Sequence, residues 1–146
     1  MPMTPFDREI GLRLLGLHQL LYERTGGLVG HRLGRVRMLL LRTRGRRSGE
    51  QRAAALLYLE DGANRVVVGS KGGSDRPPAW LLNLEADPDV EVQVGTRRYR
   101  ASAAIATAAE RGRLWPLFTE SWPDYRRYQE QTTREIPLVI LSPRQG

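Results

Sequence analysis

The sequence contains no cysteine, and its only histidines are His18 and His31. Disulfides, thiolate catalysis, cysteine-ligated zinc and iron–sulfur clusters are therefore excluded. Two histidines argue against a histidine-based metal site and give little support to a Ser-His-Asp hydrolase. We therefore expect a site without a metal.

Long apolar runs are also lacking, since none approaches the roughly 20 residues that a membrane-spanning helix needs. The first residues do not show the pattern of a secretory signal peptide. Apolar residues make up 40% of the chain and charged residues 27%, which is typical of a soluble globular protein. We predict one domain over residues 1–146 and a cytoplasmic location.

Lysine is almost absent, because Lys71 is the only one, so arginine supplies nearly all of the positive side chains behind the net charge of +7. Codon usage in a GC-rich genome explains such an excess as well as function does. The stretch RTRGRRSGEQR, residues 42–52, nevertheless concentrates five arginines around two glycines. Arginine favours bidentate contact with phosphate or carboxylate. Its partner is a nucleic-acid backbone, an acidic membrane surface or the anionic groups of a small molecule.

Apolar residues at helical spacing predict a helix over residues 7–22, ended by the TGG sequence at 25–27. We interpret this N-terminal segment, residues 1–27, as a helix that packs on the domain core. The alternative is a helix on a membrane surface, since Arg8, Arg13 and Arg24 flank its apolar face.

The remaining chain predicts a mainly β, α+β domain. Short apolar or alternating runs predict strands at 35–43, 51–60, 65–71, 90–95, 96–106 and 136–143. Helices are expected after Ser74 or Asp75, with prolines 77–78 in the first turn, over 107–121 from a Thr107–Glu110 capping box, and within 122–134. Hairpin connections favour about six mostly antiparallel strands that curl into a small barrel over residues 35–143.

Three segments are candidates for a site. The GSKGGSD sequence at 69–75 lets the backbone approach a ligand closely and precedes a predicted helix N-terminus, where a phosphate fits. It matches neither the Walker nor the GxGxxG pattern, so alone it is as well explained as a flexible loop. The arginine-rich turn at 42–52 is the second candidate, and it adds positive charge that an anionic ligand would need. Trp122, Tyr125 and Tyr128 recur every three residues and predict an aromatic helix face, which suits either a core or a planar ligand.

Nucleic acid ranks low among the partners. Such binders usually add a recognition helix or stacking aromatics beside the basic residues, and no predicted helix here has an arginine-rich face. We therefore predict no nucleic-acid partner.

Three sequences together carry a resemblance: TRGRRSGEQR, VVVGSKGGSDRPPAWLLNLEADPDVEVQVG and WPDYRRYQEQTTREIPLVIL. Between about Leu39 and Pro143 the chain resembles the deazaflavin-dependent nitroreductase family, also described as coenzyme F-420-dependent quinone reductases. The resemblance implies a split β-barrel of the flavin-binding type. It also implies the ligand, an 8-hydroxy-5-deazaflavin that carries a phosphodiester and a poly-glutamate tail.

The resemblance assigns cofactor-binding roles by position. The turn matches residues that hold the tail and phosphate, the next strand matches a groove wall, and the VGSK and AWLLN sequences match segments near the phosphate and ring. These residues are Arg46, Arg47, Ser48, Arg52, Ala53, Ala54, Ala55, Leu56, Leu57, Val68, Gly69, Ser70, Lys71, Ala79, Trp80, Leu81, Leu82, Asn83 and Tyr125. Leu57 and Trp122 stand where some relatives place a tyrosine, which alters the substrate side of the pocket.

We predict an oxidoreductase that transfers hydride from reduced coenzyme F-420 to a quinone or similar planar acceptor, nitro compounds included. Ser70, Tyr125 and Tyr128 are the expected catalytic residues, which orient the acceptor or relay a proton. The alternatives are an FMN enzyme of the same barrel type and a non-catalytic binder of the cofactor or another anion. We favour a monomer over a dimer, and peripheral membrane contact would run through the N-terminal helix.

Overall fold

The computed structural model describes residues 37–144. The predicted helix at 7–22 and its membrane role lie outside the described residues.

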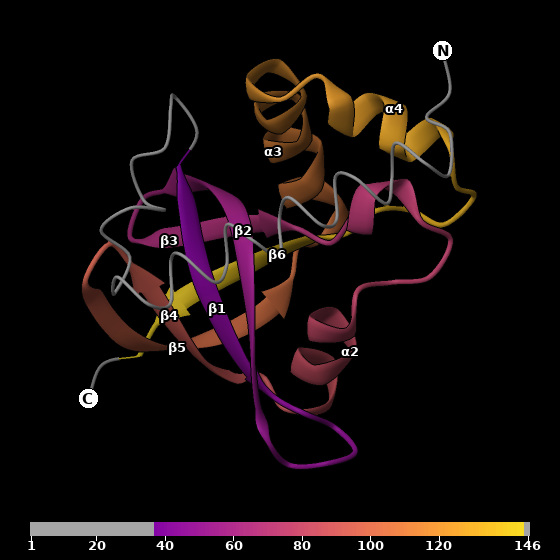
Figure 1. Ribbon diagram of the computed structural model, residues 1–146. Helices are drawn as coiled ribbons and strands as arrows, with labels where there is room; N and C mark the ends of the chain where they lie inside the picture. Colours follow the sequence, from indigo (N-terminus) through magenta and orange to yellow (C-terminus); the bar gives the residue numbers. More distant parts are fainter. Residues whose placement is uncertain (1–36, 145–146) are drawn as a thin grey trace.

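Six strands form a closed antiparallel barrel in the order β1-β2-β3-β6-β5-β4 (Figure 1). This confirms the predicted fold class. Every pairing is antiparallel, and β3 pairs with β6 across a long stretch of sequence, with Val67 opposite Val139. The strands are β1 (Met38–Arg44), β2 (Gln51–Asp61), β3 (Asn64–Val68), β4 (Asp89–Val94), β5 (Arg97–Ile105) and β6 (Leu138–Pro143).

The barrel interior is filled by alternate residues of all six strands. On β1, Leu39 and Leu41 belong to the main core cluster, while Met38 and Leu40 belong to a separate cluster with Ala55 of β2. This division follows from the strand geometry, because successive side chains point to opposite faces. The continuous apolar run of β1 is therefore buried on both faces.

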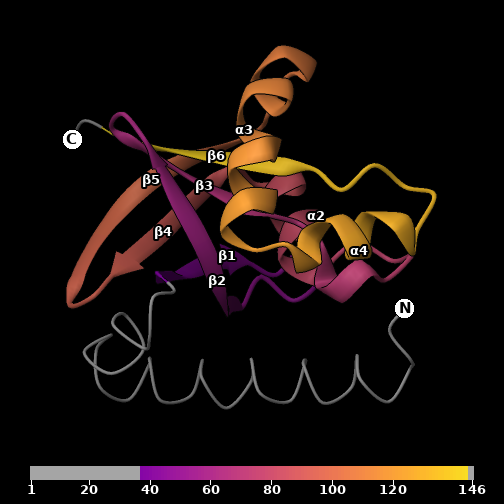
Figure 2. The same ribbon diagram turned by 90° about the horizontal axis from the view of Figure 1, so that it is seen from above.

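Within residues 37–144, three α-helices accompany the barrel: α2 (Ala79–Ala86), α3 (Ala108–Ser121) and α4 (Asp124–Glu130). A short 3-10 turn, η2 (Lys71–Gly73), precedes α2. In Figures 1 and 2, α2 and α4 lie on the same side of the barrel. The loop of η2 contacts α4 directly, so two segments that are far apart in sequence meet there.

The predicted start of α2 is wrong. The helix begins at Ala79, and its N-cap is Pro78, whose backbone is extended and whose side chain makes no capping hydrogen bond. Pro78 disfavours a helical conformation at Pro77, so the helix cannot extend back to the serine and aspartate at 74–75. The Ser74 hydroxyl accepts a hydrogen bond from the Arg76 N–H instead, at 3.2 Å.

The predicted capping box of α3 is confirmed. The Thr107 hydroxyl accepts from the Glu110 N–H at 3.2 Å, and the Glu110 carboxylate accepts from the Thr107 N–H at 2.9 Å. Thr107→Ala removes the first bond, and we expect it to lower the free energy of unfolding by about 1 kcal/mol. Urea unfolding measures this change. Ser121→Ala, at the opposite end of α3, is the control and should change it much less; equal effects would contradict the capping role.

No helix within residues 37–144 is long and apolar enough to cross a membrane.

Candidate functional site

The arginine-rich turn between β1 and β2 is closed by backbone bonds. The Gly45 N–H donates to the Glu50 carbonyl at 2.7 Å, and the Gly49 N–H donates to the Gly45 carbonyl at 2.8 Å. A side chain at Gly45 would meet the Ser48 hydroxyl at 2.7 Å, so glycine permits this closure. The Ser48 hydroxyl accepts from the Glu50 N–H. The turn is therefore a defined structure, and it holds its arginines at fixed backbone positions.

The arginine side chains of this turn differ in their surroundings. Arg47 is exposed and has no ion-pair partner among the residues that the structure describes. Arg52 lies 3.3 Å from the carboxylate of Glu50, but both side chains are largely exposed, so this pair is weak. Both guanidinium groups are accessible to an anionic ligand.

Asn83 connects the turn to α2. Its side chain is 3% exposed. Its amide oxygen accepts from the Arg46 backbone N–H at 3.1 Å and from the Arg46 guanidinium at 3.4 Å. Its amide nitrogen donates to the Thr43 hydroxyl at 3.2 Å. These bonds occupy both ends of the amide, so Asn83, expected to bind the cofactor, holds the turn in this structure.

We expect Asn83→Ala to lower the free energy of unfolding by about 2 kcal/mol, because Thr43 and the Arg46 N–H then lose buried partners. Urea unfolding measures the loss. Glu85→Ala, on the exposed side of α2, is the control and should change stability by less than about 0.5 kcal/mol. Equal stability of the Asn83 variant and the wild type would contradict the anchoring role.

The loop at 69–74 has an unusual backbone. Ser70 is in the right-handed helical region, while Lys71, Gly72 and Gly73 have φ values of 47°, 61° and 81°. A lysine rarely adopts positive φ, and such strain gathers at functional sites. A right-handed residue followed by a left-handed one turns successive N–H groups toward a common concavity, which binds anions. Within residues 37–144 the N–H groups of Ser70, Lys71 and Gly72 have no hydrogen-bond acceptor.

Two buried side chains with hydroxyl groups lie on the segments that meet here. Ser70 is 8% exposed and Tyr125 of α4 is 6% exposed. Neither hydroxyl has a hydrogen-bond partner in the described part of the chain. Neither oxygen is among the fully buried polar atoms that lack a partner, so both hydroxyls reach the surface from largely buried side chains. Each can therefore form a hydrogen bond to a ligand.

Aromatic side chains from α3 and α4 surround Tyr125. Its ring centroid lies 6.0 Å from Phe118, 6.4 Å from Trp115 and 5.9 Å from Tyr128. Trp122 and Tyr128 are partly buried against the same cluster. Burial raises the pKa of both the Tyr125 and Tyr128 hydroxyls, so both are neutral hydrogen-bond donors near neutral pH. The predicted aromatic face exists, but α3 contributes part of it, which the sequence spacing did not indicate.

The predicted groove wall on β2 divides between two faces. Ala54 and Leu56 pack against the barrel core. Ala53, Ala55 and Leu57 pack in the outer cluster of β1 and β2, and Leu57 also contacts the aromatic cluster. Because successive strand residues point in opposite directions, only one of these sets can line a single groove. The outer set contains Leu57, the member of the predicted wall that contacts the aromatic cluster.

The predicted contacts on α2 divide in the same way. Trp80 and Leu81 are buried in the barrel core. Ala79 is exposed and Leu82 is half-buried. Leu81 also packs close to Gly69, where an added Cβ would lie 3.3 Å from its side chain. Of the residues expected on α2, Ala79 and Leu82 are therefore the ones accessible to a ligand, whereas Leu81 packs against the loop at Gly69.

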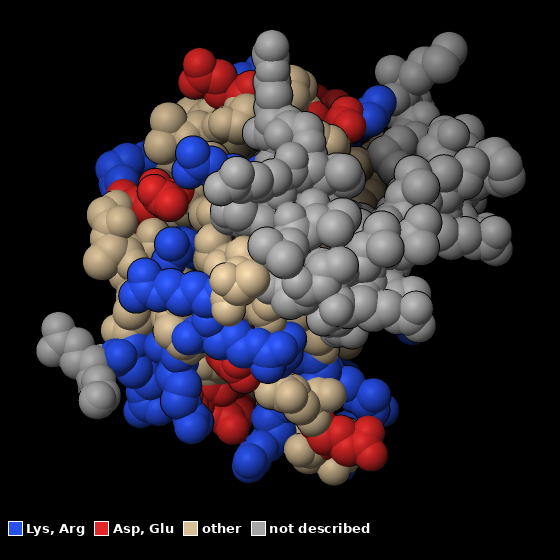
Figure 3. Space-filling view, turned by 60° about the vertical axis from the view of Figure 1, so that its left-hand side comes forward, with Lys and Arg blue, Asp and Glu red and all other residues tan. Residues whose placement is uncertain are grey.

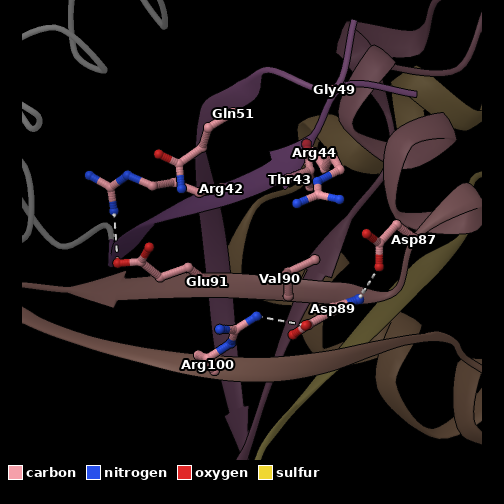
Figure 4. Close-up of a pocket in the computed structure, with 10 residues that line it drawn as sticks. All are labelled: Arg42, Thr43, Arg44, Gly49, Gln51, Asp87, Asp89, Val90, Glu91 and Arg100. Carbon is pink, nitrogen blue, oxygen red and sulfur yellow. Dashed lines mark hydrogen bonds and ion pairs between the residues drawn. The ribbon is translucent and has the colours of Figure 1, made fainter. Parts of the chain in front are cut away.

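A cavity of about 410 Å³ lies beside the arginine-rich turn, between β1, the start of β2, β4, β5 and the end of α2 (Figure 4). Its charges are largely paired: Arg100 contacts Asp89 at 2.7 Å, and Arg42 lies 3.7 Å from Glu91. None of the predicted site residues lines it. Its lining residues are Arg42, Thr43, Arg44, Gly49, Gln51, Asp87, Asp89, Val90, Glu91 and Arg100.

Basic side chains gather on one face of the molecule with a few carboxylates between them (Figure 3). Carboxylate-rich ligands are attracted to such a face.

Sequence reasoning missed Arg134, in the connection between α4 and β6. Its guanidinium donates to the carbonyls of Gly69, Ser70 and Ser74. No sequence signal marks this contact, because it spans 60 or more residues.

Fold and site together define a class: a split-barrel protein with a loop lined by N–H groups against an aromatic cluster, and a basic turn that is bonded to the neighbouring helix α2. In such a site a bound planar cofactor, rather than a set of catalytic side chains, supplies the chemistry.

The model of the F-420H(2)-dependent quinone reductase family matches residues 14–143. An F-420H(2)-dependent quinone reductase of Mycobacterium tuberculosis is 39% identical over 142 residues, which are 94% of this chain and 95% of that protein. The chain therefore belongs to the F-420H(2)-dependent quinone reductase family, a family of oxidoreductases.

Two solved structures are similar in fold and sequence. One, described as a domain-swapped dimer, is 34% identical with a TM-score of 0.69, covering 95% of this chain and 100% of that one. The other, an F-420-H2-dependent reductase, is 35% identical with a TM-score of 0.66, covering 72% of this chain and 93% of that one. Both likenesses agree with the split-barrel fold.

Proposed function

We propose that this chain binds reduced coenzyme F-420 and uses it to reduce a quinone. The observation that carries the proposal is the pair of hydroxyls on the buried side chains of Ser70 and Tyr125, which lack partners among the described residues and lie on two segments in contact. The names of the relatives support the same cofactor and acceptor.

The residues present fit the cofactor's anionic parts. The N–H groups of Ser70, Lys71 and Gly72 suit its phosphate, and the Lys71 side chain adds a positive charge beside them. Arg47 and Arg52 suit the carboxylates of the glutamate tail, since they are exposed on a fixed turn. FMN offers one phosphate and no tail, so it would leave the basic turn unused.

The apolar surroundings fit a planar ring. Leu57 packs against the cluster that contains Tyr125 and Tyr128, and the small side chains of Ala53 and Ala55 lie on the same face of β2. Small side chains leave room for a ring, and a mostly apolar pocket with few polar groups is how planar ligands are held.

When bound, reduced coenzyme F-420 would supply a hydride, a hydrogen that carries two electrons, to a planar acceptor. A quinone needs that hydride and one proton to become a hydroquinone. The Tyr125 hydroxyl is neutral, because burial raises its pKa, so it can donate a hydrogen bond to a quinone oxygen. Tyr128, whose pKa is also raised, is half-buried beside it and is the second candidate donor. Ser70 holds the cofactor side of the site.

The test is an anaerobic assay in which the protein is mixed with reduced coenzyme F-420 and menadione. The increase in oxidised cofactor is monitored. Oxidation that depends on both the protein and the quinone supports the proposal. Binding of the cofactor without turnover on a panel of quinones would instead identify a non-catalytic binder. Turnover with reduced FMN but not with reduced F-420 would identify a flavin enzyme.

We expect Tyr125→Phe to lower kcat with menadione by about tenfold or more, because one hydrogen bond to the developing quinol oxygen is lost. The free energy of unfolding should stay unchanged or rise slightly, since the deleted hydroxyl has no partner within residues 37–144. Steady-state kinetics and urea unfolding measure the two quantities. A loss of stability with unchanged kcat would assign the hydroxyl to the fold.

Tyr99→Phe is the matched control. The Tyr99 hydroxyl accepts a hydrogen bond from Arg65 at 2.8 Å, away from the proposed site. That variant should lose stability and keep its kcat.

We further propose that nitro compounds with a planar ring serve as alternative acceptors, since ring size and apolar contact govern access to such a site. The same anaerobic assay with a nitroimidazole in place of menadione tests this.

We also propose a monomer in solution, although one of the similar solved structures is a domain-swapped dimer. Light scattering distinguishes the two states. Membrane contact would rest on the N-terminal segment, outside the described residues, and vesicle sedimentation tests it.

A further inference from the structure

Arg134 holds three carbonyl groups of one loop. Its Nη1 donates to the Gly69 carbonyl at 3.1 Å, its Nη2 to the Ser70 carbonyl at 2.8 Å and its Nε to the Ser74 carbonyl at 2.9 Å. Guanidinium presents its donors in a rigid fork and keeps its charge in proteins. One side chain therefore fixes the orientation of several peptide groups at once.

The position of Arg134 is itself fixed from α4. Its carbonyl accepts from the Gln129 amide at 2.8 Å, and its N–H donates to the Thr132 hydroxyl at 3.3 Å. Nearby, the Gly69 N–H donates to the Pro137 carbonyl at 2.9 Å. The segment between α4 and β6 thus bonds the loop through several of its backbone groups.

The peptide groups whose carbonyls bond Arg134 present their N–H groups on the other side of the loop. In a trans peptide the C=O and N–H point in opposite directions, and residues 37–144 contain no cis peptide. Because the Gly69 carbonyl faces Arg134, the Ser70 N–H faces away from it. The Ser70 carbonyl likewise turns the Lys71 N–H away. These are two of the N–H groups without an acceptor among the described residues.

We propose that Arg134 is a positioning residue for anion binding: by holding the carbonyls of Gly69 and Ser70, it aims the N–H groups of Ser70 and Lys71 at the cofactor phosphate. The guanidinium also neutralises the negative ends of these peptide dipoles, so the positive ends dominate toward the ligand. Arg134 itself does not touch the ligand. The inference rests on the proposed function, and it names a residue that acts through the loop.

The test compares Arg134→Ala and Arg134→Lys with Arg111→Ala. Arg111 holds the same connecting segment, through the Ile136 carbonyl at 3.1 Å and Gln129 at 3.2 Å, but it makes no bond to the loop. Its guanidinium also lies 4.5 Å from the Trp115 ring centroid, so it serves as the control for a loss of packing both in this segment and in the aromatic cluster.

Fluorescence titration with oxidised coenzyme F-420 gives the dissociation constants. We expect Arg134→Ala to raise Kd at least tenfold, to raise the KM for reduced cofactor similarly and to change kcat at saturation by less than about threefold. Arg134→Lys should recover part of the lost cofactor affinity, because the lysine ammonium group retains the positive charge but lacks the planar set of donors that guanidinium has. Arg111→Ala should lower stability and leave Kd near the wild-type value. A wild-type Kd for Arg134→Ala, or an equal rise for Arg111→Ala, overturns the proposal.

A second measurement needs no variant. In the wild-type protein labelled with nitrogen-15, adding oxidised coenzyme F-420 should shift the amide resonances of Ser70 and Lys71. Binding that leaves both resonances unmoved overturns the role of Arg134 and leaves the proposed function standing. Absence of any F-420 binding by the wild type overturns the proposed function itself, so the two failures are distinguishable.

Discussion

Replacing Ser70 with alanine should weaken the binding of oxidised coenzyme F-420 by about tenfold to a hundredfold. The residue is only 8% exposed, yet its hydroxyl makes no hydrogen bond within residues 37–144. A hydrogen bond to a charged ligand contributes roughly 1.5–3 kcal/mol, which corresponds to this range of Kd. The free energy of unfolding of the ligand-free protein should hardly change. Calorimetric titration and urea unfolding measure the two quantities.

The control for this variant is Ser102→Ala, an exposed serine on β5. It should change neither affinity nor stability. If Ser70→Ala keeps its affinity for the cofactor but loses stability, the hydroxyl serves the fold and not the ligand. That result would remove the observation on which the proposed site depends.

Replacing Gly73 with alanine should lower the free energy of unfolding by about 2–5 kcal/mol. A left-handed backbone costs a residue with a side chain about 1–2 kcal/mol, and forcing atoms into a filled space costs about 1–3 kcal/mol more. At this position φ is 81°, and an added Cβ would lie 2.9 Å from both the Cα and the carbonyl oxygen of Tyr128. These are backbone atoms of α4, so they cannot rotate away. Loop and helix must separate, and cofactor affinity should fall with stability.

Gly72→Ala is a matched control within the same turn. Its φ is 61°, but an added Cβ meets no atom within 4 Å. Only the conformational cost of about 1–2 kcal/mol applies. Equal losses for the two variants in urea unfolding would show that contact with α4 does not restrict this loop.

The barrel could be predicted from the sequence because local patterns specify it. The strand of alternating residues at 90–95, the turn signals and the Thr107–Glu110 capping box each act over a few residues. The start of α2 was missed, since two consecutive prolines keep the chain extended where a serine and an aspartate otherwise suggest a cap. Here a local backbone restriction outweighs a capping preference.

The site was only partly predictable, because its geometry depends on contacts between distant segments. The sequence pointed to the basic turn and to the loop at 69–75. It could not show that Asn83 binds Arg46 across 37 residues, or that Arg134 binds Ser70 across 64. Nor could it tell which side of β2 faces the aromatic cluster, because that depends on how α3 and α4 pack against the barrel.

The central claim is that the loop and the basic turn hold the phosphate and the glutamate tail of a deazaflavin. Calorimetry with three ligands tests it most directly: oxidised coenzyme F-420, the same deazaflavin without phosphate and glutamates, and FMN. We predict that F-420 binds at least about tenfold more tightly than either of the others, a difference of about 1.4 kcal/mol or more. Equal affinity for the deazaflavin without its tail, or tighter binding of FMN, would contradict the account.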